Sequence, residues 1–384
     1  MKKLAIITSH PIQYNAPLFK KIAERGNIKI KVFYTWSQAK NNFFDNEFNK
    51  AIKWDIPLLD GYDYEFVKNI STKPNSRHFR GIICPDLISK TEAWKPNAIL
   101  VYGWAFHAHL KVLKYFKGKI PIFFRGDSTL IDEKTGIRKI FRAILLKYIY
   151  NFVDFAFYVG INNKEYFLKA GLQEKQLIFL PYVVDKKHFE DNNKHNYTKK
   201  AEKTRINLGI NQSEKVIAFI GKFIKKKNPI LILKAIQKYN LQNKEKIKLL
   251  FIGSGKQEGF LKKTAKKDKN ILFLPFVNQK EMPIAYRIAD IFILPSKGPH
   301  ETWGISVNEA LACERFVIVS NKVGSAIDLV KNNNNGEIFK SNNLDSLIEK
   351  IKISLNKTIF DTSQFNNYSI EKASLIVEIS VNNL

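Results

Sequence analysis

The sequence predicts an α/β protein made of two doubly wound, Rossmann-like domains, and three observations lead to this prediction. Short apolar runs alternate with segments of helical periodicity along most of the chain, which is typical of parallel sheets covered by helices on both faces. A polar stretch interrupts this alternation, which then starts again. The chain of 384 residues is also too long for one ordinary core and comfortable for two.

In the first half, six apolar runs have the character of strands buried on both faces: 4–8, 30–35, 98–103, 120–126, 155–160 and 177–182. Helical periodicity lies between several of them, at 17–23, 107–116, 137–150 and 164–170. We assign residues 1–190 to an N-terminal Rossmann-like domain that forms one side of a cleft.

The second half begins after a segment with almost no apolar side chains, residues 191–205, which we interpret as a polar linker. Residues 206–384 form a C-terminal domain in which the expected strands are 216–221, 248–253, 271–276, 291–295 and 316–320. A last helix, at about 369–381, could pack on either domain. A ligand is expected in the cleft between the two.

The composition limits the possible classes of protein. Cys84 and Cys313 lie far apart in the sequence and form no metal-ligand spacing, which argues against a disulfide framework and suits a reducing cytoplasm. No apolar run reaches the roughly 18–20 residues of a membrane span, and the apolar stretch after the basic N-terminus is too short for a signal peptide. We expect a cytoplasmic protein, with peripheral attachment to the inner face of the plasma membrane as an alternative.

The formal net charge is +28, from 63 basic and 35 acidic residues. Three interpretations remain open: a compositional bias toward Lys, Asn and Ile, attraction to an anionic membrane or substrate, and binding of nucleic acid. No recognisable nucleic-acid-binding motif accompanies the charge, so we expect no nucleic-acid partner.

The segment 137–150 places Ile137, Ile140, Phe141, Ile144 and Leu145 on one helical stripe, with Arg138, Lys139, Arg142 and Lys147 around it. The default prediction is a helix that packs this stripe on the core and leaves a basic face in solvent. The alternative is a helix that lies on an anionic membrane surface.

The segment 221–229, GKFIKKKNP, is a candidate anion-binding loop. It follows a buried strand and carries Lys222 and Lys227, and phosphate oxygens are bound by such charges together with free backbone amides. A solvated lysine run at the end of a strand is an equally good interpretation of this segment alone.

The segment 300–312, HETWGISVNEALA, places two acids eight positions apart. Gly304 between them favours a loop that carries Glu301, followed by a helix that carries Glu309. Amides near Gly304 and Ile305 could bind a diphosphate at the helix start, Glu309 the hydroxyls of a ribose, and Glu301 the hydroxyls of a sugar. Each acid alone is more simply explained as an ordinary loop or helix-start residue, but both, with Lys222 and Lys227, follow strands of one doubly wound domain, where such sheets bind ligands.

These motifs resemble glycosyltransferase family 4, a retaining family with the GT-B fold. Residues 289–330 include the family's E-x7-E element at Glu301 and Glu309, and 221–229 resembles its phosphate loop, with Lys222 where arginine is usual. The segment 180–189 resembles the one that closes the family's first domain. Segments 9–23 and 124–130 are similar to a bacterial branch that builds surface polysaccharides, although 10–13 lacks the glycines frequent in the family's first loop.

The resemblance implies transfer of a sugar from a nucleotide-diphosphate donor to a glycan or lipid-linked acceptor, with the anomeric configuration retained. Glu301 is then a catalytic candidate, and Trp303, Gly304 and Ile305 join Lys222, Lys227 and Glu309 as the donor-binding set. The sequence contains no Asp-x-Asp pair of the kind that holds metal in metal-dependent transferases. We expect no metal and no cofactor other than the donor substrate.

The acceptor-side candidates follow two strands of the first half: His107 and His109 after 98–103, and Arg125 and Asp127 after 120–126. His10 is a further candidate. For each histidine a surface or hydrogen-bonded core position is the more ordinary explanation. We expect Arg125 and Asp127 to line the site, with Asp127 as a second catalytic candidate.

Two alternatives remain open at this stage. A nucleotide-sugar epimerase on the same scaffold would bind the donor without transferring its sugar. A basic nucleic-acid-binding protein would bind strands with a steep dependence on salt.

Overall fold

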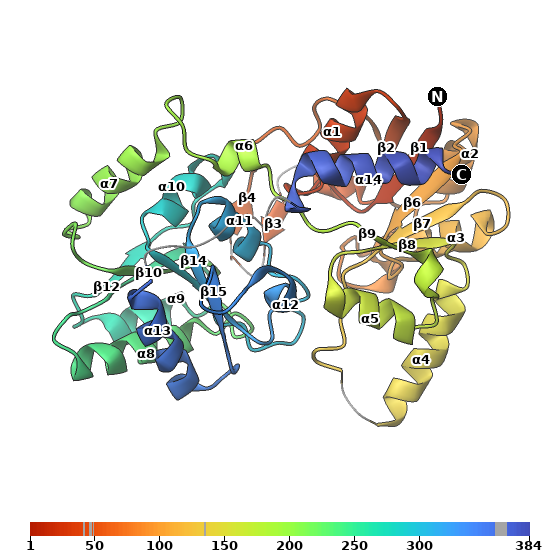
Figure 1. Cartoon of the computed structure of the whole chain (residues 1–384). Helices are drawn as coiled ribbons and strands as arrows, with labels where there is room; N and C mark the ends of the chain where they lie inside the picture. Colours follow the sequence, from red (N-terminus) through yellow and green to blue (C-terminus); the bar gives the residue numbers. More distant parts are fainter. Residues whose placement is uncertain (41–42, 46–47, 49, 134–135, 358–366) are drawn as a thin grey trace. The chain divides into compact units, whose positions relative to one another are not determined.

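The computed structural model describes residues 1–384 except 41–42, 46–47, 49, 134–135 and 358–366, and the chain forms two compact units (Figure 1). Unit 1 consists of Met1–Phe43, Ile56–Val183 and Tyr368–Leu384, and unit 2 of Phe44–Asp55 and Val184–Asn367. Each unit is therefore assembled from segments that are separate in the sequence.

Unit 1 contains a seven-stranded parallel sheet with the order β5-β2-β1-β6-β7-β8-β9. Its strands are β1 (Lys3–Thr8), β2 (Lys29–Tyr34), β5 (Asp63–Phe66), β6 (Ala98–Tyr102), β7 (Ile122–Arg125), β8 (Phe155–Tyr158) and β9 (Leu177–Phe179). Alternate side chains of β1 enter different cores: Leu4 and Ile6 one, Ala5 and Ile7 the other. Both faces of the sheet are thus buried, which explains why its central strands are apolar throughout.

The helices of unit 1 cover these two faces: α1 (Ala16–Arg25), α2 (Leu87–Ala93), α3 (His107–Phe116), α4 (Ile137–Tyr150), α5 (Ile161–Lys169) and α14 (Ile370–Asn382). The last helix, α14, lies beside α1 (Figure 1). Its residues Ala373, Val377 and Val381 join the core that contains Leu4 and Ile6.

Unit 2 contains a six-stranded parallel sheet with the order β12-β11-β10-β13-β14-β15. Its strands are β10 (Val216–Lys222), β11 (Lys248–Ser254), β12 (Ile271–Leu274), β13 (Ile291–Leu294), β14 (Phe316–Ser320) and β15 (Gly336–Phe339). Strand order turns at the neighbours β10 and β13, and the carboxyl ends of strands beside such a turn are where open α/β sheets bind ligands.

The helices of unit 2 are α6 (Lys186–Phe189), α7 (Tyr197–Asn207), α8 (Pro229–Gln242), α9 (Glu258–Ala265), α10 (Met282–Arg287), α11 (Ser306–Ala312), α12 (Ala326–Leu329) and α13 (Leu344–Leu355). Apolar side chains of α8, α9 and α13 pack on one face of the sheet. Strands β3 (Phe43–Asp45) and β4 (Lys50–Ile52) form a separate two-stranded sheet.

The segment expected to be a linker, 191–205, contains most of α7 and belongs to unit 2. Asp191 accepts hydrogen bonds from the backbone amides of Tyr197 (2.7 Å) and Thr198 (2.9 Å) at the start of this helix. Burial works to raise the pKa of Asp191, but these hydrogen bonds and the Arg287 charge lower it to about 2. The polar composition of this segment is thus that of a capped surface helix of unit 2, and not that of a linker.

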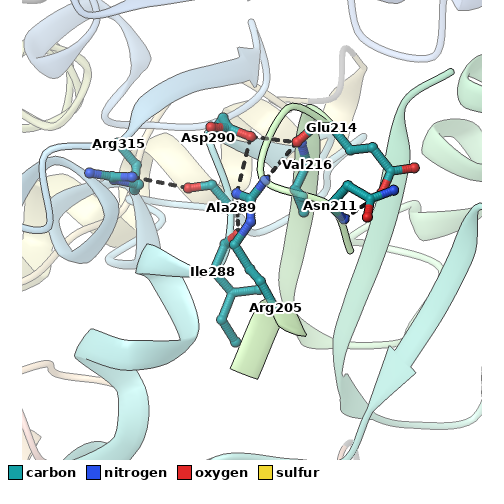
Figure 2. Close-up of polar contacts among 8 residues, drawn as sticks. All are labelled: Arg205, Asn211, Glu214, Val216, Ile288, Ala289, Asp290 and Arg315. Atoms are coloured by element: carbon teal, nitrogen blue, oxygen red, sulfur yellow. Dashed lines mark hydrogen bonds and ion pairs between the residues drawn. The ribbon is translucent and has the colours of Figure 1, made fainter. Parts of the chain in front are cut away.

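Arg205 near the end of α7 anchors this helix to the sheet of unit 2 (Figure 2). Its guanidinium donates to the carbonyl oxygens of Ile288 (3.1 Å) and Glu214 (2.6 Å) and lies 3.5 Å from the carboxylate of Asp290. Asp290 in turn accepts from the amide of Val216, the first residue of β10, at 2.7 Å. The network therefore lies at the amino ends of β10 and β13.

The structure overturns the default prediction for α4. The packed side chains of this helix are Leu146, Ile149 and Tyr150. The stripe expected in the core, from Ile137 to Leu145, is exposed instead. The apolar side chains of α4 thus form two faces, of which only one contacts unit 1.

Among the described residues, no helix combines the length and apolar composition that crossing a membrane requires.

Candidate functional site

The loop after β13 leads into α11, as the position of Gly304 predicted. The loop extends through Ile305, and α11 begins at Ser306. Gly304 has a φ of +88°, and a Cβ at this position would lie 2.8 Å from Cγ1 of Val323 and 3.0 Å from Cδ2 of Leu294. Only glycine fits this turn, which places Glu301 in the loop and Glu309 in the first turn of the helix.

Glu301 and Lys227 form a buried ion pair. Lys227 Nζ lies 2.8 Å from the Glu301 carboxylate, and the Ser296 hydroxyl donates to the same carboxylate at 2.8 Å. Burial works to raise the pKa of Glu301, but the charges of Lys227 and Lys226 and these hydrogen bonds lower it. Glu301 is therefore ionised and acts as a hydrogen-bond acceptor, the role that binding sugar hydroxyls requires.

Glu309 has the opposite electrostatic environment. Burial raises its pKa to about 7, although hydrogen bonds from Tyr286 and Gln279 and the charge of Lys227 work to lower it. Tyr286 donates its phenolic hydrogen to Glu309 at 2.8 Å. The charge of Lys227 thus acts on both predicted acids, so the structure brings Lys227, Glu301 and Glu309 into one cluster.

Two buried side-chain atoms near this cluster have no hydrogen-bond partner among the described residues: Asn228 Nδ2 and Ser306 Oγ. Asn228 directly follows Lys227, and Ser306 begins the helix that carries Glu309. Unpaired buried polar groups are costly, and both of these can donate to an anionic oxygen. A diphosphate at the carboxyl ends of the strands would satisfy them.

The other donor-binding candidates have different surroundings. Lys222 ends β10, and its Nζ lies 5.0 Å from the ring centroid of Phe48, which belongs to the inserted segment Phe44–Asp55. The Trp303 indole is buried and donates to Asn308 at 2.8 Å. Trp303 therefore fixes the loop and presents no indole surface to a ligand.

Arg125 and Asp127 of unit 1 lie with two tyrosines. The Arg125 guanidinium is buried and donates to the carbonyl oxygens of Leu180 (2.7 Å) and Pro181 (3.2 Å), and it lies 5.0 Å from the Tyr182 ring. Burial, followed by the charge of Asp127, raises the pKa of both Tyr14 and Tyr182. Arg125 thus fixes the segment Leu180–Tyr182 at the end of β7, and the charge of Asp127 acts on the two phenols.

The three histidine candidates differ in their availability. His109 is completely buried: Nδ1 lies 3.0 Å from the carbonyl oxygens of Tyr102 and Gly103, and Nε2 lies 2.8 Å from the Thr35 hydroxyl. Burial lowers its pKa to about 4, so the ring is neutral, donates from Nδ1 and accepts at Nε2. His109 is a core residue of unit 1 and cannot touch an acceptor.

His107 begins α3 and is partly buried, and its Nδ1 has no hydrogen-bond partner among the described residues. Burial, with the charges of Lys111 and Arg80, lowers its pKa. His10 has Nδ1 2.9 Å from the Ser9 hydroxyl, and burial lowers its pKa to about 4. Of these two, His107 has a ring nitrogen that is buried and unpaired within the described residues.

Sequence reasoning missed Tyr286, Ser296, Gln279 and Phe48. The first three contact the two acids from α10, from the loop after β13 and from the turn before α10. Phe48 reaches unit 2 through the insertion, where its carbonyl oxygen accepts from the Ser254 hydroxyl at 3.0 Å. No local sequence pattern predicts these contacts, because each depends on how segments distant in the sequence pack together.

The part of the chain that holds Lys227, Glu301 and Glu309 also matches a known family. Residues 200–372 match the family described as glycosyl transferases group 1. This region coincides with most of unit 2. An uncharacterized glycosyltransferase of Methanocaldococcus jannaschii is 30% identical over 146 residues, which is 37% of the chain and 36% of the relative. The match thus spans little more than a third of that relative's length.

Solved structures resemble the whole chain in fold. HepE from Anabaena, in complex with UDP and glucose, has a TM-score of 0.63 at 15% identity. The match covers 100% of the present chain and 98% of the HepE chain. The lipopolysaccharide outer core galactosyltransferase WaaB has a TM-score of 0.66 at 11% identity. This match covers 100% of the present chain and 99% of the WaaB chain. With the two parallel sheets, these similarities confirm the predicted fold class, two Rossmann-like units of the GT-B type.

Proposed function

We propose that the protein is a retaining glycosyltransferase that moves a sugar from a nucleotide-diphosphate donor to a glycan or lipid-linked acceptor without a metal ion. The observation that carries this proposal is the cluster of Lys227, Glu301 and Glu309 at the carboxyl ends of the unit 2 strands, inside the region that matches the group 1 family. The UDP in the Anabaena structure makes a uridine nucleotide the first choice to test.

Each part of the cluster suits one part of such a donor. When the glycosyl–phosphate bond breaks, its electron pair stays on the diphosphate, and Lys222, Lys226 and Lys227 would stabilise that charge. Glu301, ionised and buried, would accept hydrogen bonds from hydroxyls of the transferred sugar. Glu309 would bind the ribose. A surface-polysaccharide acceptor is supported by the resemblance of 9–23 and 124–130 and by the fold of the lipopolysaccharide enzyme.

Nucleotide binding tests the donor site first. UDP, GDP and ADP are added separately in a thermal-shift experiment, where a ligand at 100 times its Kd stabilises the folded state by about 2.7 kcal/mol. We expect one nucleotide to raise the melting temperature clearly. Lys222→Ala should lower the affinity for that nucleotide about tenfold or more, because a charged hydrogen bond to phosphate contributes roughly 1.5–3 kcal/mol to binding.

Lys225→Ala is the matched control, because Lys225 is an exposed lysine of the same loop. It should bind the nucleotide as the unchanged protein does. No shift with any of the three nucleotides, or equal losses in the two variants, would contradict the donor site.

Turnover is tested with labelled UDP-glucose and a polysaccharide or lipid-linked primer, with EDTA present. We expect label in the primer and an α-linked product from the α-linked donor. Glu301→Gln should lower turnover about a hundredfold while keeping most of the nucleotide shift. Release of an altered sugar without transfer would favour an epimerase, and a strict requirement for added metal would contradict the metal-independent mechanism.

A further inference from the structure

Helix α4 carries an apolar stripe that faces away from unit 1. Six residues with the spacing of one helical face form it: Ile137, Ile140, Phe141, Ile144, Leu145 and Tyr148. All six side chains are exposed, Ile137 at 69%, Phe141 at 67% and Ile144 at 63%. The opposite face, with Leu146 and Ile149, is the one that packs on unit 1. The stripe is therefore not a core face.

Basic residues border this stripe on both sides. From the helical repeat, Arg138 lies beside Leu145 at one edge, with Arg142 next to it, and Lys147 lies beside Ile140 at the other edge. Lys114 of α3 extends the border, since its Nζ lies 5.2 Å from the ring centroid of Tyr148. The helix itself contains no acid.

Lys139 and Glu133 differ from these residues because they are paired with each other at 3.0 Å on the side toward unit 1. Glu133 also pairs with Lys169 at 2.6 Å. Two lysines thus compensate the charge of Glu133, and the outward face of α4 stays cationic.

We infer that this face of α4 binds the surface of an anionic lipid bilayer. An exposed apolar stripe with cationic edges matches the two layers of such a surface: the apolar side chains enter the boundary between headgroups and acyl chains, and the cations meet lipid phosphates. Tyr148 at the end of the stripe suits the interface, because its ring is apolar and its hydroxyl polar. A second copy of this chain fits less well, because two such faces would bring like charges together.

The inference deepens the proposed function, since it gives a lipid-linked acceptor a surface on unit 1. Vesicle binding requires neither donor nor turnover, so its failure and the failure of the transferase proposal are distinguishable. A chain that binds vesicles and transfers no sugar would support the surface and contradict the transferase.

The test is co-sedimentation of the full chain with vesicles of phosphatidylcholine alone and of an equal mixture with phosphatidylglycerol. We expect binding to the mixed vesicles only, weakened by salt. Phe141→Ser with Ile144→Ser should lower vesicle affinity at least about tenfold, because it removes two apolar side chains from the middle of the stripe. Arg138→Gln with Arg142→Gln should lower it and reduce its dependence on salt.

Matched variants on other helices serve as controls. Ile206→Ser with Leu241→Ser removes two apolar side chains that are 74% and 86% exposed in unit 2, and Lys199→Gln with Lys203→Gln removes two exposed charges of α7. Both control variants should bind vesicles like the unchanged protein. All four double variants, test and control, should have the melting temperature of the unchanged protein.

Two results would overturn the inference. One is a vesicle result against the stripe, in which the Phe141→Ser and Ile144→Ser variant binds mixed vesicles no more weakly than the unchanged protein does. The other is a dimer in sedimentation velocity without lipid that this variant separates while vesicle binding stays the same, which would assign the stripe to a second copy of the chain.

Discussion

Glu309 is a buried carboxyl group whose protonation changes close to neutral pH. Burial raises its pKa to about 7, against the hydrogen bonds of Tyr286 and Gln279 and the charge of Lys227. Below this pH the group can donate one hydrogen bond, and above it the group can only accept. A residue expected to accept from two ribose hydroxyls is thus held in an environment that disfavours its accepting form.

This environment predicts that Glu309→Gln removes a pH dependence of stability. Because the folded state holds the proton more tightly than the unfolded state, the contribution of Glu309 is fully present below pH about 4.5 and is lost as pH rises to about 7. The loss amounts to at most about 3 kcal/mol. In urea unfolding, the free energy of unfolding at pH 8 minus that at pH 5 should be more positive in Glu309→Gln than in the unchanged protein, because the variant lacks the loss that Glu309 contributes as pH rises.

Glu202→Gln is the control for this measurement, because Glu202 is an exposed acid on α7. It should keep the pH dependence of the unchanged protein. An equal pH dependence in Glu309→Gln would mean that the pKa of Glu309 is not raised.

At the scale of residues, the sequence could predict which acids and lysines gather but not what surrounds them. The spacing of Glu301 and Glu309 around Gly304, together with a lysine loop after another strand, was enough to expect one cluster with Lys227. The hydroxyls of Ser296 and Tyr286 are set by tertiary packing. For the same reason His109, which had the pattern of a site residue, is a core residue bonded to Thr35.

At the scale of elements, α7 shows how one arginine can attach a polar helix. Few of its side chains are buried, so apolar packing contributes little to its attachment. Arg205 instead binds two carbonyl oxygens and the Asp290 carboxylate at the start of the sheet (Figure 2). A guanidinium can bind several acceptors at once because its donors have a fixed fork geometry, which an ammonium lacks.

We therefore expect Arg205→Lys to destabilise unit 2 by about 1–3 kcal/mol, since at least one partly buried carbonyl loses its partner. Urea unfolding measures this change. The nucleotide shift relative to the variant's own melting temperature should stay the same, because the network lies at the amino ends of the strands. Lys203→Ala, an exposed neighbour on α7, is the control, and an Arg205→Lys protein as stable as this control would contradict the anchoring role.

The apolar pattern of α4 and the polar pattern of α7 led to wrong expectations for a common reason. Periodicity reports which side chains share a face, but it does not report what that face contacts. The stripe of α4 was correctly identified as one face and incorrectly assigned to the core. The segment of α7 was assigned to a linker because it has no apolar stripe. Single polar residues such as Arg205 attach this helix, and they give no periodic pattern in the sequence.

At the scale of the whole molecule, the alternation of strands and helices was sufficient to predict two parallel sheets. All eleven strands expected from apolar runs are present. Most are buried on both faces, and the edge strands β9 and β12 are partly buried. The edge strands β5 (DYEF) and β15 (GEIF) were missed, since such short runs with charged residues give no periodic signal. The return of the chain to unit 1 through α14 also has no local signal, because the same apolar face could pack on either unit.

The packing of α14 gives the last prediction. Its residues Val377 and Val381 are buried in the core of unit 1, and Glu378 accepts from Arg25 at 2.6 Å. Val377→Ala with Val381→Ala should lower the stability of unit 1 by about 1–4 kcal/mol, because each deletion leaves a cavity. Hydrogen exchange should therefore speed up in β1 and α1 and stay unchanged in β10 and β11. The control, Leu375→Ala with Ile379→Ala, alters side chains that are 39% and 49% exposed on the same helix and should change exchange little. Equal acceleration in both units would mean that the last helix stabilises the molecule as one cooperative body.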